Sequence, residues 1–374
     1  MSLAYLRRIA EGDLLKRGAR YMKYDKAVVI GRFQPFHNGH VHMVKEALAV
    51  ADTVYIVIGS ANLYPDVRNP FTSDERKHMI QEWINISGLS RKDRKRVVLT
   101  SVNDYLYNEQ KWKMEVRKAI QQEDSEQIVI VGAEKGKDSY WLTEFGWKTH
   151  YITLLKSDGN VISASDFRNQ YLRSDFVNGL YRKSDNIVFP ISTIEFMEEF
   201  RDSPTYERLR EEQLKYDKEL EKFKDYPYPE ALNCCTADSV VICNNHLLVI
   251  KRKFSPGKYA YALPGGHKNA DETFLQCAIR ELTEEVKMKV PTKVIAGSIR
   301  NSFMFDHPHR SAYFSKPTVA QYIVIEPNQD GSLPKVRGAD DALDARWMPL
   351  HKVQENQAQF FDDHYQIIVA FIGI

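Results

Sequence analysis

Four glutamates and an arginine are crowded into the stretch Gly266–Met288, which constrains this chain more than any other feature. The stretch has the apolar spacing of an amphipathic helix, and Asp271 is a good N-cap residue near its start. At about 100° per residue, Glu281, Glu284 and Glu285 are expected on one exposed face. The expected buried face consists of Leu275, Ala278, Ile279, Leu282 and Val286. Carboxylates at this spacing repel each other by a few tenths of a kcal/mol per pair, roughly, unless a cation lies among them.

Two interpretations of the acidic face are open from the residues alone. Carboxylate oxygens are hard ligands that suit Mg²⁺ or Mn²⁺, and these ions bridge phosphate groups. The alternative is an ordinary amphipathic helix whose acidic face is solvated.

The length of 374 residues predicts two or three domains. The chain has 43% hydrophobic and 27% charged residues with a formal net charge of +2, which predicts no general affinity for nucleic acid. No apolar run reaches 18 residues, so we expect no membrane span. The four cysteines lack zinc-site spacing and suggest no disulfide framework, so we expect a reducing, cytoplasmic location.

Alternating strand-like and helix-like segments predict an α/β domain over residues 26–185, with a parallel sheet flanked by helices. Helices are expected to begin near Gly39, Ser73 and Asn108. Residues 1–25 are interpreted as a basic N-terminal extension. The expected strands are Ala27–Ile30, Thr53–Ile58, Arg96–Ser101, Gln127–Val131 and His150–Leu154.

A helical linker is expected over residues 186–232, followed by an α+β domain with a mixed sheet over residues 233–374. Glu207–Lys224 is nearly all charged or aromatic and predicts a solvated helix. Its thin apolar stripe would be Leu209, Leu214, Leu220 and Phe223. The prolines after Asp225 end this helix. The expected strands of the last domain are Val240–Ile242, His246–Ile250, Val294–Ser298 and Val319–Ile325.

A second constellation, Gly31–His40, follows the first predicted strand and leads into a helix. A glycine turn at the carboxyl end of the first strand, opening onto a helix N-terminus, is where α/β sheets bind phosphates. His37 and His40 can donate hydrogen bonds to phosphate oxygens there. The alternative is a metal-binding pair of histidines at i and i+3.

This decamer resembles the signature of the His-x-Gly-His nucleotidyltransferase superfamily, in the form found in archaeal-type nicotinamide-nucleotide adenylyltransferases. Asn69–Arg76, Lys137–Leu142 and Ile162–Arg168 resemble further segments of that group. The resemblance implies a Rossmann-like fold in which His37, His40 and Arg168 hold the phosphates of ATP. The other nucleotide contacts that it implies are Gly31, Arg32, Phe33, Gln34, Gly39, Arg76, Lys137, Asp138, Ser163 and Ser165.

The resemblance also implies the reaction. The phosphate of nicotinamide mononucleotide would attack the α-phosphorus of ATP, giving NAD and pyrophosphate, with Mg²⁺ neutralising the leaving group. Nicotinate mononucleotide is the alternative acceptor. Candidates for the nicotinamide pocket are Trp83, Tyr107, Trp112 and Trp141, although aromatic residues more often belong to a core.

The glutamate-rich stretch resembles the Nudix box. The matching residues are Gly266, Glu272, Arg280, Glu281, Leu282, Glu284, Glu285 and Met288. The family implies that Glu281 and Glu285 bind Mg²⁺ or Mn²⁺, that Glu284 assists, and that the backbone at Gly265 lies close to the metal. It also implies that Arg280 and Glu272 orient these carboxylates. The general base is open, with Asp340 and Asp341 as candidates. Lys287 replaces the family's glycine and predicts strain at the helix end.

Phe305–Ser311 and Asp362–Ile368 resemble segments of bifunctional proteins that fuse this adenylyltransferase to an ADP-ribose pyrophosphatase. That resemblance implies hydrolysis of ADP-ribose to AMP and ribose 5-phosphate. Tyr313–Lys316 departs from the arginines usual there, which leaves another nucleoside diphosphate derivative open as substrate. A non-catalytic ADP-ribose sensor is the other alternative, and the sequence leaves a homo-oligomer open.

Overall fold

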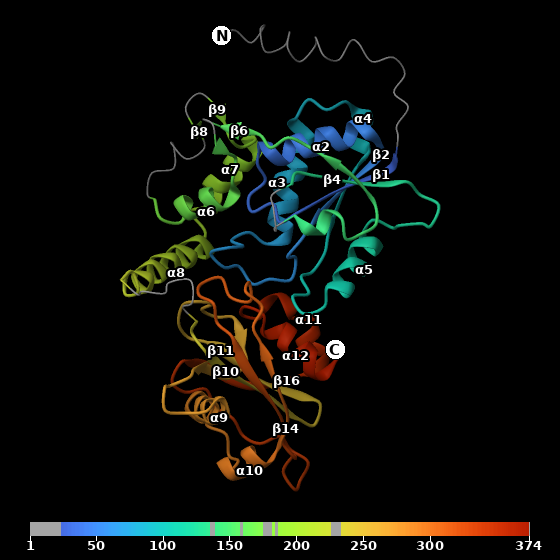
Figure 1. Cartoon of the computed structure of the whole chain (residues 1–374). Coiled ribbons are helices and arrows are strands. Elements are labelled where there is room, and N and C mark those ends of the chain that lie inside the picture. The colour runs from blue at the N-terminus through green and yellow to red at the C-terminus, as the bar shows by residue number, and fades with distance from the viewer. Residues whose placement is uncertain are drawn as a thin grey trace.

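The computed structural model describes residues 24–134, 139–157, 160–174, 182–183, 186–225 and 233–373. Figure 1 shows an N-terminal domain and a C-terminal domain, with the long helix α8 (Pro204–Glu221) at their junction. In the described part of the chain, no helix combines the length and apolarity that crossing a membrane requires.

A five-stranded parallel sheet in the order β3-β2-β1-β4-β5 forms the centre of the N-terminal domain. Its strands are β1 (Tyr24–Gly31), β2 (Ala51–Ile58), β3 (Val97–Ser101), β4 (Ile128–Gly132) and β5 (Lys148–Tyr151). The predicted parallel sheet is confirmed, although β5 ends at Tyr151 rather than Leu154. The chain reverses its direction of strand addition between β1 and β4, and open α/β sheets bind ligands at such a switch point.

Helices cover both faces of this sheet, which explains why its central strands are apolar on both sides. The helices are α2 (Asn38–Val50), α3 (Ser73–Ile86), α4 (Arg91–Lys95) and α5 (Glu109–Ala119). Val29 packs with α2 and α3, whereas its neighbour Val28 packs with α5. The three predicted helix starts are confirmed, and each has a side-chain cap from His37, Thr72 or Asn108.

A helical layer follows the sheet and buries an aromatic cluster that includes Phe71, Tyr171 and Tyr206. Its helices are α6 (Ala164–Tyr171), α7 (Ile191–Phe200) and α8. Ser192 Oγ donates to the Met79 carbonyl, so α7 is fixed on α3. Two short hairpins also occur here. They pair β6 (Lys156–Ser157) with β7 (Asn160–Val161), and β8 (Arg182–Lys183) with β9 (Asn186–Ile187). A 3₁₀ turn, η1 (Tyr140–Leu142), precedes β5.

The C-terminal domain is a mixed sheet with helices on both faces. Its strands are β10 (Thr236–Cys243), β11 (His246–Arg252), β12 (Tyr261–Ala262), β13 (Gly265–His267), β14 (Ile299–Phe305), β15 (Thr318–Val324) and β16 (Ala342–Pro349). The helices are α9 (Phe274–Glu285), α10 (Thr292–Gly297), α11 (Leu350–Glu355), a 3₁₀ turn η3 (Gln357–Gln359) and α12 (His364–Ile372). Leu282 of α9 packs on one face, and Ile367 of α12 packs on the other.

The prediction of a strand over Val294–Ser298 is wrong, because α10 occupies most of that segment. Pro291 is the N-cap of α10, and its fixed φ suits a helix start. A short apolar run such as this cannot be assigned to strand or helix from periodicity alone.

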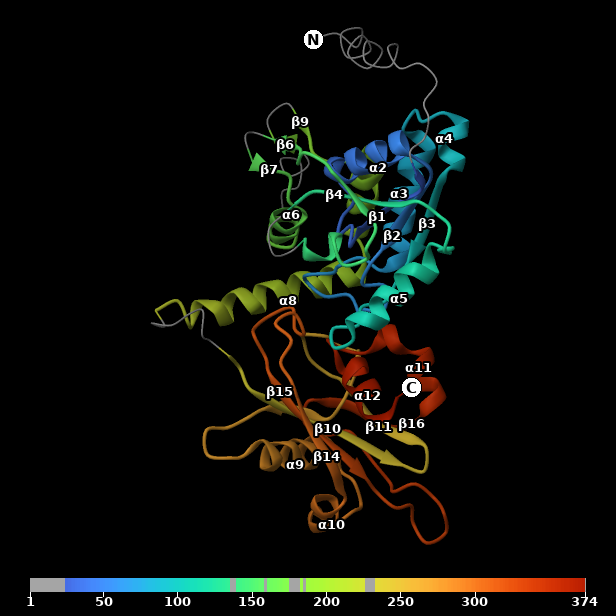
Figure 2. The same cartoon turned by 45° about the vertical axis from the view of Figure 1, so that its right-hand side comes forward.

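Helix α8 connects the two domains and is not the fully solvated helix expected from its charges. Figure 2 shows it lying between the domains. Its Glu212 is 2% exposed, and accepts hydrogen bonds from Arg208 (2.7 Å), Gly257 N (2.9 Å) and the Tyr313 hydroxyl (2.7 Å). Leu214 and Leu220 are exposed instead. A buried carboxylate with three donors fixes the C-terminal domain to the helix.

Candidate active sites

Two stacked imidazoles mark the first site, at the carboxyl end of β1. The His37 and His40 ring centroids lie 3.7 Å apart with the planes tilted by 23°. His37 caps α2 by accepting from Gly39 N at Nδ1 (3.1 Å), and its own N–H donates to His40 Nδ1 (3.2 Å). Because Nδ1 accepts in both rings, the neutral forms carry their protons on Nε2. Both rings are therefore set as Nε2 donors at a helix N-terminus.

Gly39 is required by this arrangement. A Cβ on residue 39 would lie 2.8 Å from His37 Cε1, closer than real Cβ atoms approach other atoms. The glycine of the His-x-Gly-His pattern therefore has a packing role, since any side chain would push the His37 ring out of its stack.

Arg168 reaches the same loop from α6. Its Nη1 donates to the Gln34 carbonyl (2.5 Å) and its Nη2 to Ser165 Oγ (3.0 Å). Burial and the positive charge of Arg32 lower the Arg168 pKa to about 10, which keeps it cationic at neutral pH. Gln34 in turn exchanges two hydrogen bonds with the Phe71 backbone, at 2.7 and 3.0 Å. The structure thus brings together three segments that the sequence pattern selected separately.

Arg76 has a structural role in the loops of this site, and its predicted nucleotide contact stays a prediction. It is 1% exposed and donates to the carbonyls of Arg32 (2.7 Å), Gly59 (2.6 Å), Ser60 (2.9 Å) and Thr72 (3.1 Å). Four backbone acceptors use up most of its five donors. Arg76 therefore fixes the loops after β1 and β2, and positions the site indirectly.

The remaining predicted contacts are divided between the loop and helix α6. Arg32 is exposed and its Nη1 lies 3.5 Å from Asn69 Oδ1. Phe33, two residues after Gly31, is buried in the core with a positive φ of 52°. Ser163 is the N-cap of α6, so its hydroxyl accepts from Asp166 N. Lys137 and Asp138 lie outside the described residues.

The aromatic candidates for a nicotinamide pocket belong to cores and to the domain junction. Trp83 packs on Phe36 at 5.3 Å in the sheet core, and Trp112 packs on Phe145. Trp141 packs against the same cluster as Trp112. Tyr107 donates its hydroxyl to Asp363 of the other domain (2.7 Å). These contacts are structural, as aromatic residues usually are.

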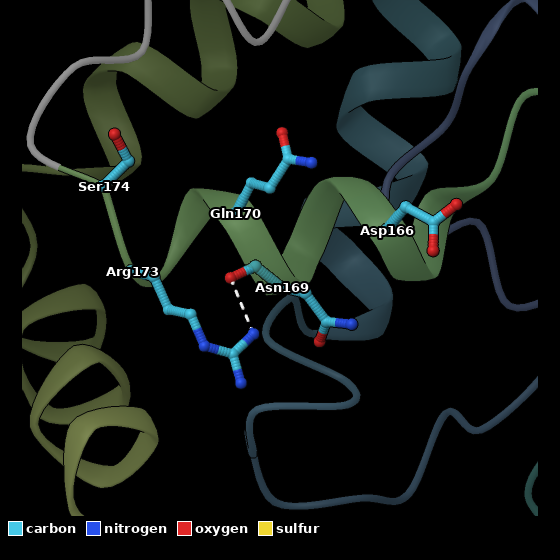
Figure 3. Close-up of a pocket in the computed structure, with 5 residues that line it drawn as sticks. All are labelled: Asp166, Asn169, Gln170, Arg173 and Ser174. Atoms are coloured by element: carbon cyan, nitrogen blue, oxygen red, sulfur yellow. Dashed lines mark hydrogen bonds between the residues drawn. The ribbon is translucent and has the colours of Figure 1, made fainter. Parts of the chain in front are cut away.

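A hollow of about 520 Å³ lies beside α6 but not at the histidine pair. Figure 3 shows its lining, which consists of Asp166, Asn169, Gln170, Arg173 and Ser174. Phe167, Arg168 and Tyr171 form the opposite, buried face of the same helix. The hollow is an open depression on the outer face of α6, whereas Arg168 lies on the buried face of that helix.

The second site is organised by Arg280 of α9. Its guanidinium binds Glu272 with two hydrogen bonds (2.7 and 3.0 Å), Glu281 (2.8 Å), Glu284 (2.9 Å) and the His267 carbonyl (3.0 Å). Its hydrogen bond lowers the Glu272 pKa to about 2, so that carboxylate stays ionised. The repulsion expected among the glutamates is offset by one arginine at their centre.

The helix differs from the prediction in its start and in its faces. It begins at Phe274 with Thr273 as N-cap, and Gln276 completes a capping box. Glu272 lies before the helix and is engaged with Asn269 N and Arg280. Leu275 is exposed, whereas Glu285 is buried at 5% exposure. Glu285 therefore does not share the solvent face with Glu284.

Glu285 is the buried carboxylate of the site. Its Oε2 accepts from Gly265 N (3.0 Å), and burial raises its pKa to about 8, with Glu281 and Asp341 adding to the shift. Burial also raises the pKa of Glu281. A Cβ at Gly265 would lie 2.4 Å from the Ala237 carbonyl, and one at Gly266 would lie 2.5 Å from Glu281 Oε1. Gly265 therefore lets the backbone pack against β10, and Gly266 lets it close against the Glu281 carboxylate.

This donor set fits a divalent cation, although the described residues contain no group of three or more metal-ligating side chains gathered in one place. Glu281 and Glu284 are turned onto Arg280, so the expected trio is not assembled. The fit rests on Glu285, a buried carboxylate whose pKa is raised by burial and, to a smaller extent, by the charges of Glu281 and Asp341. Glu281 and Glu285 beside the Gly265 backbone are hard oxygen donors.

Lys287 causes none of the expected strain. The helix ends in extended backbone at Val286, and Lys287 N donates to the Arg337 carbonyl (2.9 Å) without a positive φ. Among the candidate bases, Asp340 and Asp341 are exposed, and Asp341 contributes to the raised pKa of Glu285. Tyr313, in the segment expected to affect specificity, is buried against α8 instead.

The fold and the two sites define a class of protein with a nucleotidyltransferase domain followed by a Nudix domain. The cytidylyltransferase-like family model matches residues 28–170, and the NUDIX domain model matches residues 235–371. A nicotinamide/nicotinic acid mononucleotide adenylyltransferase from Acinetobacter baylyi is 31% identical over 192 residues, which cover 50% of this chain and 93% of that protein.

Similarity to one solved protein extends over both domains. The structure of a bifunctional NMN adenylyltransferase/ADP ribose pyrophosphatase from Francisella tularensis aligns with a TM-score of 0.83 and 33% identity, covering 94% of this chain and 99% of that one. A second structure of that protein, complexed with AMP and an Mn ion, aligns with a TM-score of 0.82. The chain belongs to this family of bifunctional adenylyltransferase and Nudix proteins.

Proposed function

We propose that the N-terminal domain transfers the adenylyl group of ATP to nicotinamide mononucleotide, and that the C-terminal domain hydrolyses ADP-ribose to AMP and ribose 5-phosphate. One observation carries the proposal. A single chain holds the stacked His37 and His40 at the switch point of one domain, and the Arg280-centred glutamates against Gly265 in the other. Both arrangements suit the formation or hydrolysis of a phosphoanhydride bond.

At the first site the protein binds and orients, and no protein nucleophile is required. A phosphate oxygen of the mononucleotide forms a bond to the α-phosphorus of ATP while the bond to pyrophosphate breaks. The Nε2 donors of His37 and His40 and the guanidinium of Arg168 stabilise the charge that moves onto the phosphate oxygens. Arg76 holds the loops that carry them.

At the second site, Glu281 and Glu285 would hold the cation, which we propose is Mg²⁺ with Mn²⁺ as a substitute. A bound divalent cation neutralises the diphosphate and activates a water molecule. The water oxygen bonds to one phosphorus as the bridging P–O bond breaks. The acceptor of the water's proton stays open, with Asp340 and Asp341, both exposed, as the candidates. Arg280 keeps Glu281 oriented.

The test supplies the full-length protein with each substrate and follows products by chromatography. ATP with nicotinamide mononucleotide should give NAD, and nicotinate mononucleotide is the parallel acceptor. ADP-ribose with Mg²⁺ or Mn²⁺ should give AMP, and NADH, diadenosine polyphosphates and ADP-sugars form the comparison panel. Binding of ADP-ribose without release of AMP would make the C-terminal domain a sensor and overturn the hydrolase assignment.

A further inference from the structure

The loop after β3, residues 102–108, lies against the C-terminal domain. Its main-chain N–H at Leu106 donates to Gln366 Oε1 of α12 (2.7 Å), and the Tyr107 hydroxyl donates to Asp363 (2.7 Å). Figures 1 and 2 both show the start of α5, which follows this loop, beside the helices at the C-terminus. The loop at the carboxyl end of β3 is therefore held by side chains from the other domain.

Hydrogen bonds in both directions join this loop to the loop after β2. Asp104 Oδ1 accepts from Ser60 N (3.1 Å), and Asn62 Oδ1 accepts from Asp104 N (3.0 Å). Between these two contacts, Ala61 N donates to the Val102 carbonyl (3.1 Å). Asn62 is 7% exposed. Because satisfied polar networks at buried positions rigidify the segments that they join, the two loops hold each other in one arrangement.

The loop after β2 supports, in turn, the loop that leads to the histidine pair. Gly59 N donates to the Gly31 carbonyl (2.9 Å). Arg76 donates to the carbonyls of Gly59 (2.6 Å) and Ser60 (2.9 Å). The same guanidinium donates to the Arg32 carbonyl (2.7 Å), which lies in the loop of the first site. A series of hydrogen bonds and short chain segments therefore connects α12 of the C-terminal domain to the first site.

Helix α12 is separated from the second site by the sheet of its own domain. Ile367, next to Gln366, packs on one face of that sheet, whereas Leu282 of the glutamate helix α9 packs on the other face. The side chain of Gln366 reaches the N-terminal domain instead. A change at Gln366 is therefore expected to act on the loops of the first site and to leave the glutamates of the second site in place.

We propose that Gln366, although it belongs to the C-terminal domain, is a positioning residue for adenylyl transfer in the N-terminal domain. The inference rests on the proposed function of the first site and deepens it. Ligands of open α/β sheets bind outside the carboxyl ends of the strands, where the loops after β1, β2 and β3 lie. In-line transfer depends on how these loops align the two reactants, so a small displacement of their support slows the reaction.

Two full-length variants separate the hydrogen bond from the packing of the side chain. Gln366→Met fills similar space without an acceptor, so the kcat of NAD synthesis per folded molecule should fall by about tenfold. Hydrolysis of ADP-ribose by the same preparation should change by less than about twofold. Gln366→Glu keeps an oxygen acceptor for Leu106 N and should retain most of the synthesis. Gln354→Met, at an exposed glutamine of α11, is the matched control.

Amide hydrogen exchange over residues 102–108 gives a second readout. Exchange should be faster in Gln366→Met and close to that of the parent in Gln366→Glu, because only methionine removes the acceptor. A lowered Tm with unchanged kcat for both reactions would show that the contact only docks the domains, and would overturn the positioning role. Equal loss of both activities, or slower synthesis without faster exchange, would also overturn it. A parent protein that makes no NAD would instead overturn the proposed function of the first site, and this inference with it.

Discussion

The two sites serve related phosphate chemistry, but the charged side chains that form them have opposite signs. The first is framed by buried arginines, Arg76 and Arg168, whose charges are stabilised by backbone carbonyls. The second contains a buried carboxylate, Glu285, with one backbone donor and a pKa raised to about 8. Cationic side chains bind phosphate groups directly, whereas carboxylates bind them only through a cation. The comparison indicates that dependence on divalent ions is stronger in the C-terminal half.

The largest expected effect comes from removing the charge of the buried carboxylate. Glu285→Gln keeps the shape of the side chain but removes a metal-ligand charge, so ADP-ribose hydrolysis should fall by about a thousandfold. NAD synthesis should change by less than about twofold, since the variant touches no group of the first site. Initial rates of both reactions measure the effect, with Glu355→Gln on exposed α11 as the control. Loss of both activities in a folded variant would show that the sites are not independent.

The reciprocal variant acts on the histidine pair. His40→Ala removes one ring of the stack and the acceptor for His37 N, so NAD synthesis should fall by about a hundredfold or more. Hydrolysis of ADP-ribose should be retained. His42→Ala, on the same helix, is the matched control and should lose neither activity. A His40→Ala enzyme with unchanged synthesis would contradict the assignment of this ring to the phosphates.

The features that could be predicted from the sequence are those that depend on local spacing. Parallel strands, helix starts with side-chain caps, and the grouping of Glu272 and Arg280 all follow from neighbours in the chain. The face on which Glu285 lies did not follow, because it depends on Gly265 N, 20 residues away. Periodicity places a residue on a helix but not against its tertiary partner.

Long-range partners explain the other differences. Arg76 lies in a motif that resembles a nucleotide site, yet three of its four acceptors come from loops 16 to 44 residues away. Glu212 resembles any exposed glutamate of a charged helix, and its partners Gly257 and Tyr313 lie in another domain. Contacts of this kind are set by tertiary packing, which spacing does not encode.

The C-terminal domain should lose stability in acid through a buried neutral histidine. His364 Nδ1 accepts from Leu263 N (2.9 Å), and burial lowers its pKa to about 3. Its folded pKa lies below the unfolded value near 6.5, so its stabilising contribution is complete above pH 6.5 and declines as pH falls. The free energy of unfolding should drop by about 1 kcal/mol per pH unit between pH 6 and 4.

Urea titrations of the parent protein and His364→Gln across this range isolate the effect. Glutamine can accept from Leu263 N but does not titrate, so the difference between the two proteins should move in favour of the variant as pH falls. Other acid-sensitive groups are common to both proteins and cancel. A difference that stays constant from pH 7 to 4 would show that His364 is not buried as a neutral ring.

The smallest effect, a small loss of stability, is expected at the contact between the two domains. Tyr107→Phe removes one hydroxyl donor from Asp363 but leaves its bidentate pair with Arg310. The loss should be about 0.5–1.5 kcal/mol, a lowering of Tm by a few degrees at most. Tyr151→Phe, at an exposed tyrosine of β5, is the control for a lost hydroxyl.

An unchanged Tm for Tyr107→Phe would place the docking energy at Glu212 and α8 instead. A hydrolysis rate that fell while synthesis held would indicate that the N-terminal domain supports the second site through Asp363 and Arg310.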